Sequence, residues 1–339
     1  MTKDGFHYKA IKDLSQFVRE STKPVIFGVG GDDFVGYPTD FKQLASEISD
    51  PNYVYECHGP LYEDPIESLS SNYSKVSMSA FDRILEFDAD DQVVKVGSDI
   101  FLQANPNRPE CGDLASELSR RGQCLPLSQP ERNPESMLPY SDALKVGRGI
   151  ALNAPHFLQS QCGSWRDWVL GMTLVLADGK VVKVGSKAVK NVAGFDIQKL
   201  IVGSYDSLAI VVDVTLRTYP IGALPKPQII RGPASLTAIH ETESLYEWCQ
   251  RVQRSDFQEA CKGAGDQLAY ADIASCTLWC RLESADAELH RYPGDWVVRA
   301  GCGKKNLEIV DETQIRLMKK AKQILDPTNK LNPGEWGFM

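Results

Sequence analysis

Three short segments carry residue types that could hold a phosphate-bearing ligand through the protein backbone. The first, Gly28-Val29-Gly30-Gly31, directly follows an apolar stretch. Successive backbone N–H groups in such a turn can form a nest for an anion. A Rossmann fingerprint would require glycine or alanine at position 33, where this chain has Asp33. The first segment is therefore predicted either to cradle a phosphate or to form a plain tight turn.

The second and third segments lie further along the chain. The motif "VKNVAGFD" contains Lys190, Asn191 and Gly194, and a small polar loop of Gly203, Ser204 and Ser207 precedes an apolar strand that starts near Leu208. Glycines at such positions are expected where the backbone adopts a positive φ or approaches another group closely. The alternative for "VKNVAGFD" is an ordinary polar loop that joins a hairpin to a short helix.

Candidates for acid–base catalysis are few. His156 could act as an acid or base, although an isolated histidine more often makes a structural hydrogen bond. Arg166 and Asp167 form a charged pair, which at a protein surface usually contributes little. The catalytic residues are therefore unknown from the sequence, with His156 and Arg166 as weak candidates.

The cysteines favour neither a metal centre nor disulfides. Cys276 and Cys280 are four residues apart, but no second close pair completes a zinc site. Scattered cysteines in a chain of this size are typical of reduced and mostly buried thiols. No metal site is predicted. The nine cysteines are Cys57, Cys111, Cys124, Cys162, Cys249, Cys261, Cys276, Cys280 and Cys302.

Strands must position these segments. The segment "DWVLGMTLVLADGKVVKVG" is predicted to form two strands around Asp178-Gly179, the first of them Trp168–Ala177. An Asp-Gly between apolar runs is the strongest short signal for a β-hairpin. Alternate apolar residues between Leu208 and Leu216 predict another strand, with Leu208, Ile210, Val212, Val214 and Leu216 on one face. Asp90-Asp91 is predicted to turn the chain into the strand Gln92–Val96.

Helices are predicted from apolar residues at helical spacing. They fall over 11–18, over 41–48 behind Asp40, over 111–118 with Gly122 ending the helix, over 245–252, and over 317–324, where the spacing of Leu317, Ala321 and Ile324 suggests a last helix. Further strands are predicted in "PVIFGVGG", "CTLWCRLES" and "DWVVRAG". The order of the elements favours an α+β fold over a regular βαβ repeat.

Composition excludes several classes of partner. The formal net charge is −8, which argues against broad electrostatic binding to nucleic acid or to anionic membranes. No apolar run reaches the roughly 20 residues needed to span a bilayer, and the first residues do not read as a signal peptide. A proline-rich seam near residue 220 marks a domain boundary. A cytoplasmic location is expected, with any membrane contact made through partner subunits.

The order of these motifs resembles a known family. The segment "SWRDWVLGMTLVLADGKVVKVGSKAVKNVAGFDIQKLIVGSYDSLAIVVDVTLRTYP" is similar to the core of the flavin-binding domain of the p-cresol methylhydroxylase (PCMH)/vanillyl-alcohol oxidase superfamily, and within it to the glycolate oxidase E-subunit family. "FDRILEFDADDQVVKVGSD" and "LASELSRRGQCLPL" resemble the preceding part of that domain, and "AKQILDPTNKLNPGEW" resembles its closing segment.

The resemblance implies a PCMH-type FAD-binding fold of two α+β subdomains over residues 1–220, a short cap domain over 221–304, and a C-terminal helix and tail over 305–339. It implies an oxidoreductase of glycolate catabolism that oxidises a small 2-hydroxy acid, in complex with a larger flavoprotein subunit and an iron–sulfur subunit. FAD would be bound non-covalently. The residues implied to bind it are Gly28, Val29, Gly30, Gly31, Leu138, Lys190, Asn191, Gly194, Gly203, Ser204, Ser207 and Leu208.

The chain departs from the family pattern in each of three flavin-contacting segments. Asp32 and Asp33 follow the first glycines, and two unit charges 4 Å apart in a partly buried site repel by roughly 4 kcal/mol. Pro139 and Tyr140 stand where the family has two glycines, and Ala209 replaces another. These changes leave a second hypothesis open, in which the chain is a non-catalytic scaffold subunit that has lost flavin binding.

Overall fold

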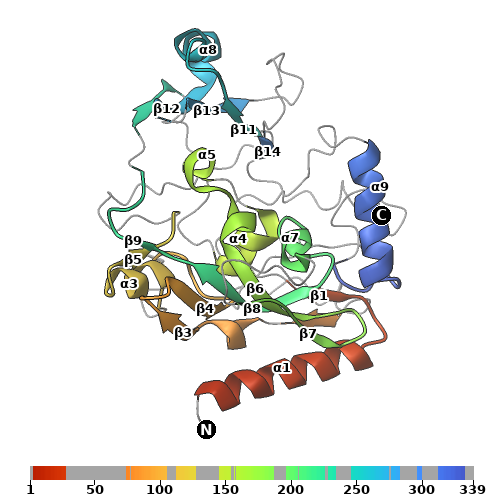
Figure 1. The fold of residues 1–339 in the computed structure, drawn as a ribbon. Coiled ribbons are helices and arrows are strands. Elements are labelled where there is room, and N and C mark those ends of the chain that lie inside the picture. The colour runs from red at the N-terminus through yellow and green to blue at the C-terminus, as the bar shows by residue number, and fades with distance from the viewer. Residues whose placement is uncertain are drawn as a thin grey trace, which may run out of the picture.

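The computed structural model describes residues 3–27, 74–76, 78–104, 112–126, 145–153, 156, 158–186, 196–204, 206–225, 228–233, 246–274, 276–282, 296–299 and 312–332. Within these ranges the chain forms two five-stranded antiparallel sheets, two short two-stranded pairs, and helices packed around them (Figure 1). The predicted α+β class is confirmed.

The first sheet has the order β3-β4-β8-β6-β7. Its strands are β3 (Ile84–Asp88), β4 (Val93–Gly97), β6 (Val169–Val175), β7 (Val181–Gly185) and β8 (Ile210–Arg217). The predicted β6–β7 hairpin around Asp178-Gly179 and the β3–β4 turn at Asp90-Asp91 are both confirmed. Trp168 was predicted to begin the first strand of this hairpin, but it is the last residue of the short helix α6 (Trp165–Trp168).

Strand β8 is buried on both faces, so the single apolar face predicted for it is wrong. Ile210 and Val212 pack toward one core, whereas Val211, Val214 and Leu216 pack into the other. The cause is a shift in the β6–β8 register between Thr173 and Leu174, a β-bulge that interrupts the simple alternation of faces.

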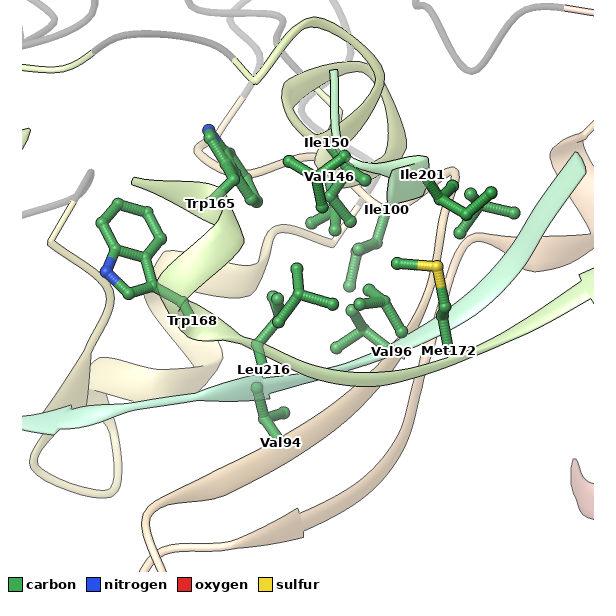
Figure 2. Packing of buried hydrophobic residues seen from close by; sticks show 14 of the residues in the cluster. Val94, Val96, Ile100, Val146, Ile150, Trp165, Trp168, Met172, Ile201 and Leu216 are labelled. Atoms are coloured by element: carbon green, nitrogen blue, oxygen red, sulfur yellow. The ribbon is translucent and has the colours of Figure 1, made fainter. Parts of the chain in front are cut away.

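Helices cover both faces of this sheet (Figure 1). On one face lies α1 (Lys3–Glu20), which packs through Ile11, Leu14 and Val18. On the other face lie α4 (Val146–Leu152), α6 and α7 (Ile197–Ile201). Figure 2 shows Val146, Ile150 and Trp165 of these helices packed over sheet residues that include Val94, Val96, Met172 and Leu216.

A buried polar cluster fixes α1 to the sheet. His7 Nε2 lies 2.9 Å from Asp213 Oδ2, and Lys95 Nζ lies 3.1 Å from Asp213 Oδ1. Burial favours the neutral acid, but the hydrogen bond from His7, the charge of Lys95 and a hydrogen bond from Thr173 together lower the pKa of Asp213. Asp213 is therefore a buried carboxylate held between the His7 ring on one side and the Lys95 ammonium on the other.

The second sheet has the order β10-β12-β13-β11-β14. Its strands are β10 (Ile229–Arg231), β11 (Tyr246–Arg251), β12 (Leu268–Asp272), β13 (Thr277–Leu282) and β14 (Trp296–Arg299), with α8 (Phe257–Ala264) and a 3₁₀ turn (Gly265–Gln267) beside them. It contacts the rest of the chain through α5 (Gln159–Cys162), where Gln161 Nε2 donates to Asp272 Oδ2 at 3.1 Å. The boundary at residue 220 stays a prediction.

The helix predicted over 245–252 is wrong, because Tyr246–Arg251 is a central strand between β13 and β14. Leu245, Trp248 and Val252 meet the helical spacing by coincidence, while the aromatic residues Tyr246 and Trp248 favour a strand. Pairing along both edges of β11 outweighs this weak helical pattern. Helix α8 was not predicted, and the helix predicted over 41–48 lies outside the described residues.

The C-terminal helix α9 (Glu312–Leu325) lies where a helix was predicted. Leu317 and Ile324 are 58% and 70% exposed, so these two apolar residues lie on the outer side of the helix. Met318, Ala321 and Leu325 pack instead on the apolar core that lies between the first sheet and helices α4, α6 and α7.

The remaining short elements are β1 (Val25–Phe27) parallel to β2 (Ser74–Val76), a 3₁₀ turn (Ser79–Phe81), and β5 (Gln123–Cys124) antiparallel to β9 (Tyr219–Pro220).

Helix α3 (Leu114–Ser119) has a side-chain cap that can be tested directly. Asp113 Oδ1 accepts a hydrogen bond from the Ser116 amide at 2.8 Å. Asp113→Ala is expected to lower the free energy of unfolding by about 1 kcal/mol, because that amide loses its acceptor. Urea unfolding measures the loss, with Glu117→Ala at a partly exposed position of the same helix as the control. Equal midpoints for the two variants would show that the cap contributes nothing.

Candidate functional site

The structure describes one of the three predicted ligand-binding segments. Gly203, Ser204, Ser207 and Leu208 form the turn between α7 and β8. The other predicted cofactor residues lie outside the described residues, as do the departures Asp32, Asp33, Pro139 and Tyr140. They are Gly28, Val29, Gly30, Gly31, Leu138, Lys190, Asn191 and Gly194.

Gly203 has the backbone conformation that its residue type predicts. Its φ is +82°, a region that side chains rarely tolerate, and its N–H donates to the Ile150 carbonyl at 2.9 Å. A Cβ placed here would lie 3.4 Å from Asn153 Cβ and 3.6 Å from Arg166 Nη2. Gly203 is needed for its backbone angle, and its α-carbon faces these two polar side chains.

Most polar groups of this turn are engaged within the protein. The Ser204 N–H donates to the Ile201 carbonyl at 3.0 Å, and the Ser207 N–H and Oγ donate to the Ser204 carbonyl at 3.1 and 2.6 Å. Ser204, Ser207 and Leu208 are buried, whereas Gly203 is partly exposed. Among these four residues, Gly203 is therefore the one that is accessible from outside, and the serines support the turn from inside.

Arg166 and Asn153 give the surface at Gly203 its chemistry. The exposed Arg166 donates from Nε and Nη2 to the Val202 carbonyl at 3.4 and 3.2 Å. Asn153 ends α4 in a left-handed conformation, and its buried Oδ1 has no hydrogen-bond partner in the described part of the chain. A guanidinium next to an open backbone position fits an anionic group such as a phosphate.

The expected Arg166–Asp167 ion pair is replaced by two separate interactions. Asp167 Oδ2 accepts from the Ser164 amide at 2.8 Å, and Ser164 Oγ in turn accepts from the Arg166 amide. This reciprocal capping fixes the first turn of α6. Arg166 is consequently left to span from α6 to the end of α7, which places its guanidinium beside Gly203.

His156 is structural. Its Nε2 lies 2.9 Å from the Gly163 carbonyl, and its ring packs against Trp168 with centroids 4.6 Å apart. Burial lowers the pKa of His156 to about 3, against a smaller opposing effect of the hydrogen bond to Gly163. The His156 side chain is 1% exposed, and its low pKa makes it a weak base. It is therefore unsuited to take a proton from a substrate at neutral pH.

The described cysteines are free thiols, and the described residues contain no group of three side chains suited to a metal ion. Burial raises the pKa of Cys124 to about 11 and that of Cys280 to about 12, with a further contribution from a neighbouring cysteine in each case. These two thiols are protonated at neutral pH and hence poor nucleophiles. Among the described helices, none has the length and hydrophobicity to cross a bilayer.

Comparison with known proteins finds that the chain is similar to parts of proteins whose names refer to 2-hydroxy acids. It is 29% identical over 176 residues to "Glycolate oxidase subunit GlcE" of Escherichia coli, covering 52% of this chain and 43% of that protein. The predicted resemblance is confirmed. It is also 33% identical over 136 residues to a D-lactate dehydrogenase of Archaeoglobus fulgidus, covering 40% of this chain and 26% of the relative.

A third relative is a D-2-hydroxyglutarate dehydrogenase of Xanthomonas citri, 28% identical over 144 residues, which cover 42% of this chain and 26% of the relative. The chain thus spans between about a quarter and less than half of the length of these relatives. No family model matches it. A structure of alkyldihydroxyacetonephosphate synthase aligns with 76% of the chain and 36% of the synthase at 12% identity and a TM-score of 0.41.

Proposed function

We propose that this chain is a FAD-binding oxidoreductase subunit that takes part in the oxidation of a small 2-hydroxy acid. The observation that carries the proposal is what the relatives have in common. Glycolate, D-lactate and D-2-hydroxyglutarate, named in their descriptions, are all 2-hydroxy acids. The cofactor follows from the family resemblance.

The described residues offer one point of contact for FAD. Gly203 would allow close approach of the backbone, Arg166 would pair with a phosphate oxygen, and Asn153 Oδ1 would accept a hydrogen bond from the ligand. When bound, FAD would supply a two-electron acceptor for the hydride of the hydroxyl-bearing carbon. The apolar core beneath α4, α6 and α7 would keep this surface rigid, because both tryptophans of α6 are fully buried.

We further propose a complex with a larger flavoprotein subunit and an iron–sulfur subunit, as the resemblance implies. The word "subunit" in the description of the Escherichia coli relative supports an assembly. In such a complex the chain would lie in the cytoplasm and reach a membrane through its partners. The second sheet, in the predicted cap domain, would cover the flavin or contact a partner.

The proposal is tested by anaerobic bleaching of the flavin absorbance near 450 nm. Purified chain loaded with FAD is mixed with glycolate, D-lactate or D-2-hydroxyglutarate, and L-lactate serves as the stereochemical control. The expected result is reduction by at least one of the three acids. A FAD-loaded chain that none of them reduces, alone or with its co-purified partners, would contradict the proposed oxidoreductase role.

A further inference from the structure

The buried side chain of Lys322 has a geometry that simple packing does not explain. Lys322 lies on α9 and is 3% exposed. Its ammonium group donates to the Ser207 carbonyl at 2.7 Å, to Asp326 Oδ2 at 2.7 Å and to the Leu331 carbonyl at 2.8 Å. All three of its protons are thus directed to fixed acceptors. One of these acceptors belongs to the Gly203–Leu208 turn.

Asp326 extends this contact into the chain that follows α9. Its Oδ2 also accepts from the Leu331 amide at 2.7 Å, and its Oδ1 accepts from the Lys330 amide at 2.8 Å. The segment after the helix is therefore folded around one carboxylate. Leu331 lies parallel to Val25 of β1, where the Val25 amide donates to the Lys330 carbonyl at 2.7 Å.

Asn332 completes the connection to β1. Its Oδ1 accepts from the Phe27 amide at 3.0 Å, and its Nδ2 donates to the Phe27 carbonyl at 2.9 Å and to the Asp206 carbonyl at 3.4 Å. Phe27 is the residue before Gly28, where the first predicted cofactor segment begins. Asp206 belongs to the turn that contains the third. A single side chain thus joins the end of β1 to that turn.

We propose that residues 322–332 form a clamp that sets the position of the Gly203–Leu208 turn relative to the end of β1. Lys322 and Asn332 are its positioning residues. That the clamp serves a cofactor rests on the proposed function, whereas its action on the turn does not. A buried ion pair is a poor source of stability, because well-packed apolar side chains serve as well or better. The ammonium group of Lys322 instead fixes the position of the turn, because it holds the Ser207 carbonyl of the turn against Asp326 and Leu331 of the clamp.

Hydrogen exchange measured by mass spectrometry on the full chain tests the clamp without any ligand. In Lys322→Met, the amides of Ser204 and Ser207 are expected to exchange at least tenfold faster than in the wild type. Amides of β6 should keep their rates. Lys320→Met, an exposed position on the same helix, is the matched control. Unchanged exchange in the turn, or equal loosening of turn and β6, would overturn the proposal.

Lys322→Met leaves Asp326 as a buried carboxylate without its cation, so a second variant separates stability from positioning. The double variant Lys322→Met/Asp326→Asn removes both charges and is expected to regain most of the Tm that Lys322→Met loses. Its turn amides should still exchange faster than in the wild type, and it should bind FAD at least tenfold more weakly than the wild type. If the double variant recovers slow exchange of the turn amides and FAD affinity together with its Tm, then Lys322 and Asp326 serve stability alone, and the positioning role is refuted. If the wild-type chain binds no FAD, the proposed function fails, and the exchange rates still decide the clamp.

Discussion

Acidification from pH 6.5 to pH 4 is expected to cost the folded chain about 3 kcal/mol through His156 alone. The pKa of this buried ring falls from 6.5 to about 3 on folding. Between these values the unfolded chain binds a proton that the folded chain excludes. The contribution of neutral His156 is therefore fully present above about pH 6.5 and is lost as the pH falls, by about 1.4 kcal/mol per unit.

His156→Phe should abolish this dependence. The phenyl ring preserves packing against Trp168, but the Gly163 carbonyl loses its hydrogen bond, which costs about 1 kcal/mol at pH 7. Urea unfolding followed by tryptophan fluorescence at pH 7, 6, 5 and 4 gives both quantities. The slope of unfolding free energy against pH should be shallower in His156→Phe, while Tyr8→Gln, at an exposed position of α1, should retain the wild-type slope. Parallel slopes for all three proteins would refute the assignment.

Trp165→Ala is expected to destabilise the chain by about 3–5 kcal/mol, because a fully buried indole leaves a cavity that the fold cannot close. Trp165 sits between α4 and Trp168, with the two indole centroids 5.6 Å apart. Thermal and urea unfolding should show the loss. Phe17→Ala at an exposed position of α1 is the aromatic control and should change stability by less than about 1 kcal/mol.

A double-mutant cycle shows whether the stability lost in Trp165→Ala arises from the packing of Trp165 against Gly149 of α4. A Cβ at Gly149 would lie 2.2 Å from Trp165 Cζ2, so Gly149→Ala should cost about 1–3 kcal/mol in the wild type. With Trp165→Ala the clash disappears, and alanine is the better helix former. Gly149→Ala should then be neutral or stabilising. An equal cost of Gly149→Ala in both backgrounds would contradict the packing described for α4 and α6.

The sequence predicted those parts of the fold that local signals determine. Asp178-Gly179 specified the hairpin, and the apolar stretch before Arg217 specified β8. Elements whose conformation depends on long-range contacts were predicted wrongly. Tyr246–Arg251 became a strand through pairing on both edges, and the bulge opposite Thr173 placed β8 residues in two cores. Neither the pairing nor the bulge has a signature within a short window of residues.

The candidate site was predictable in part, for the same reason. Gly203 was recognised because its backbone requirement is local. Arg166 was predicted to belong to a surface ion pair or to take part in catalysis, and Asn153 was missed. An asparagine after a short helix is a known signal for a left-handed cap, so Asn153 could have been found. Lys322 and Asn332 act on residues more than 100 positions away, and only the spacing of Lys322 and Asp326 hinted at a pair.

The central claim, that this chain binds FAD, is tested most directly by measuring flavin in the purified protein. The desalted chain is denatured, and released FAD is quantified against protein, before and after incubation with excess FAD. We expect close to one FAD per chain, with a visible flavin absorbance spectrum before denaturation. Absence of flavin after incubation would contradict the claim for this chain and would favour the scaffold role in a complex.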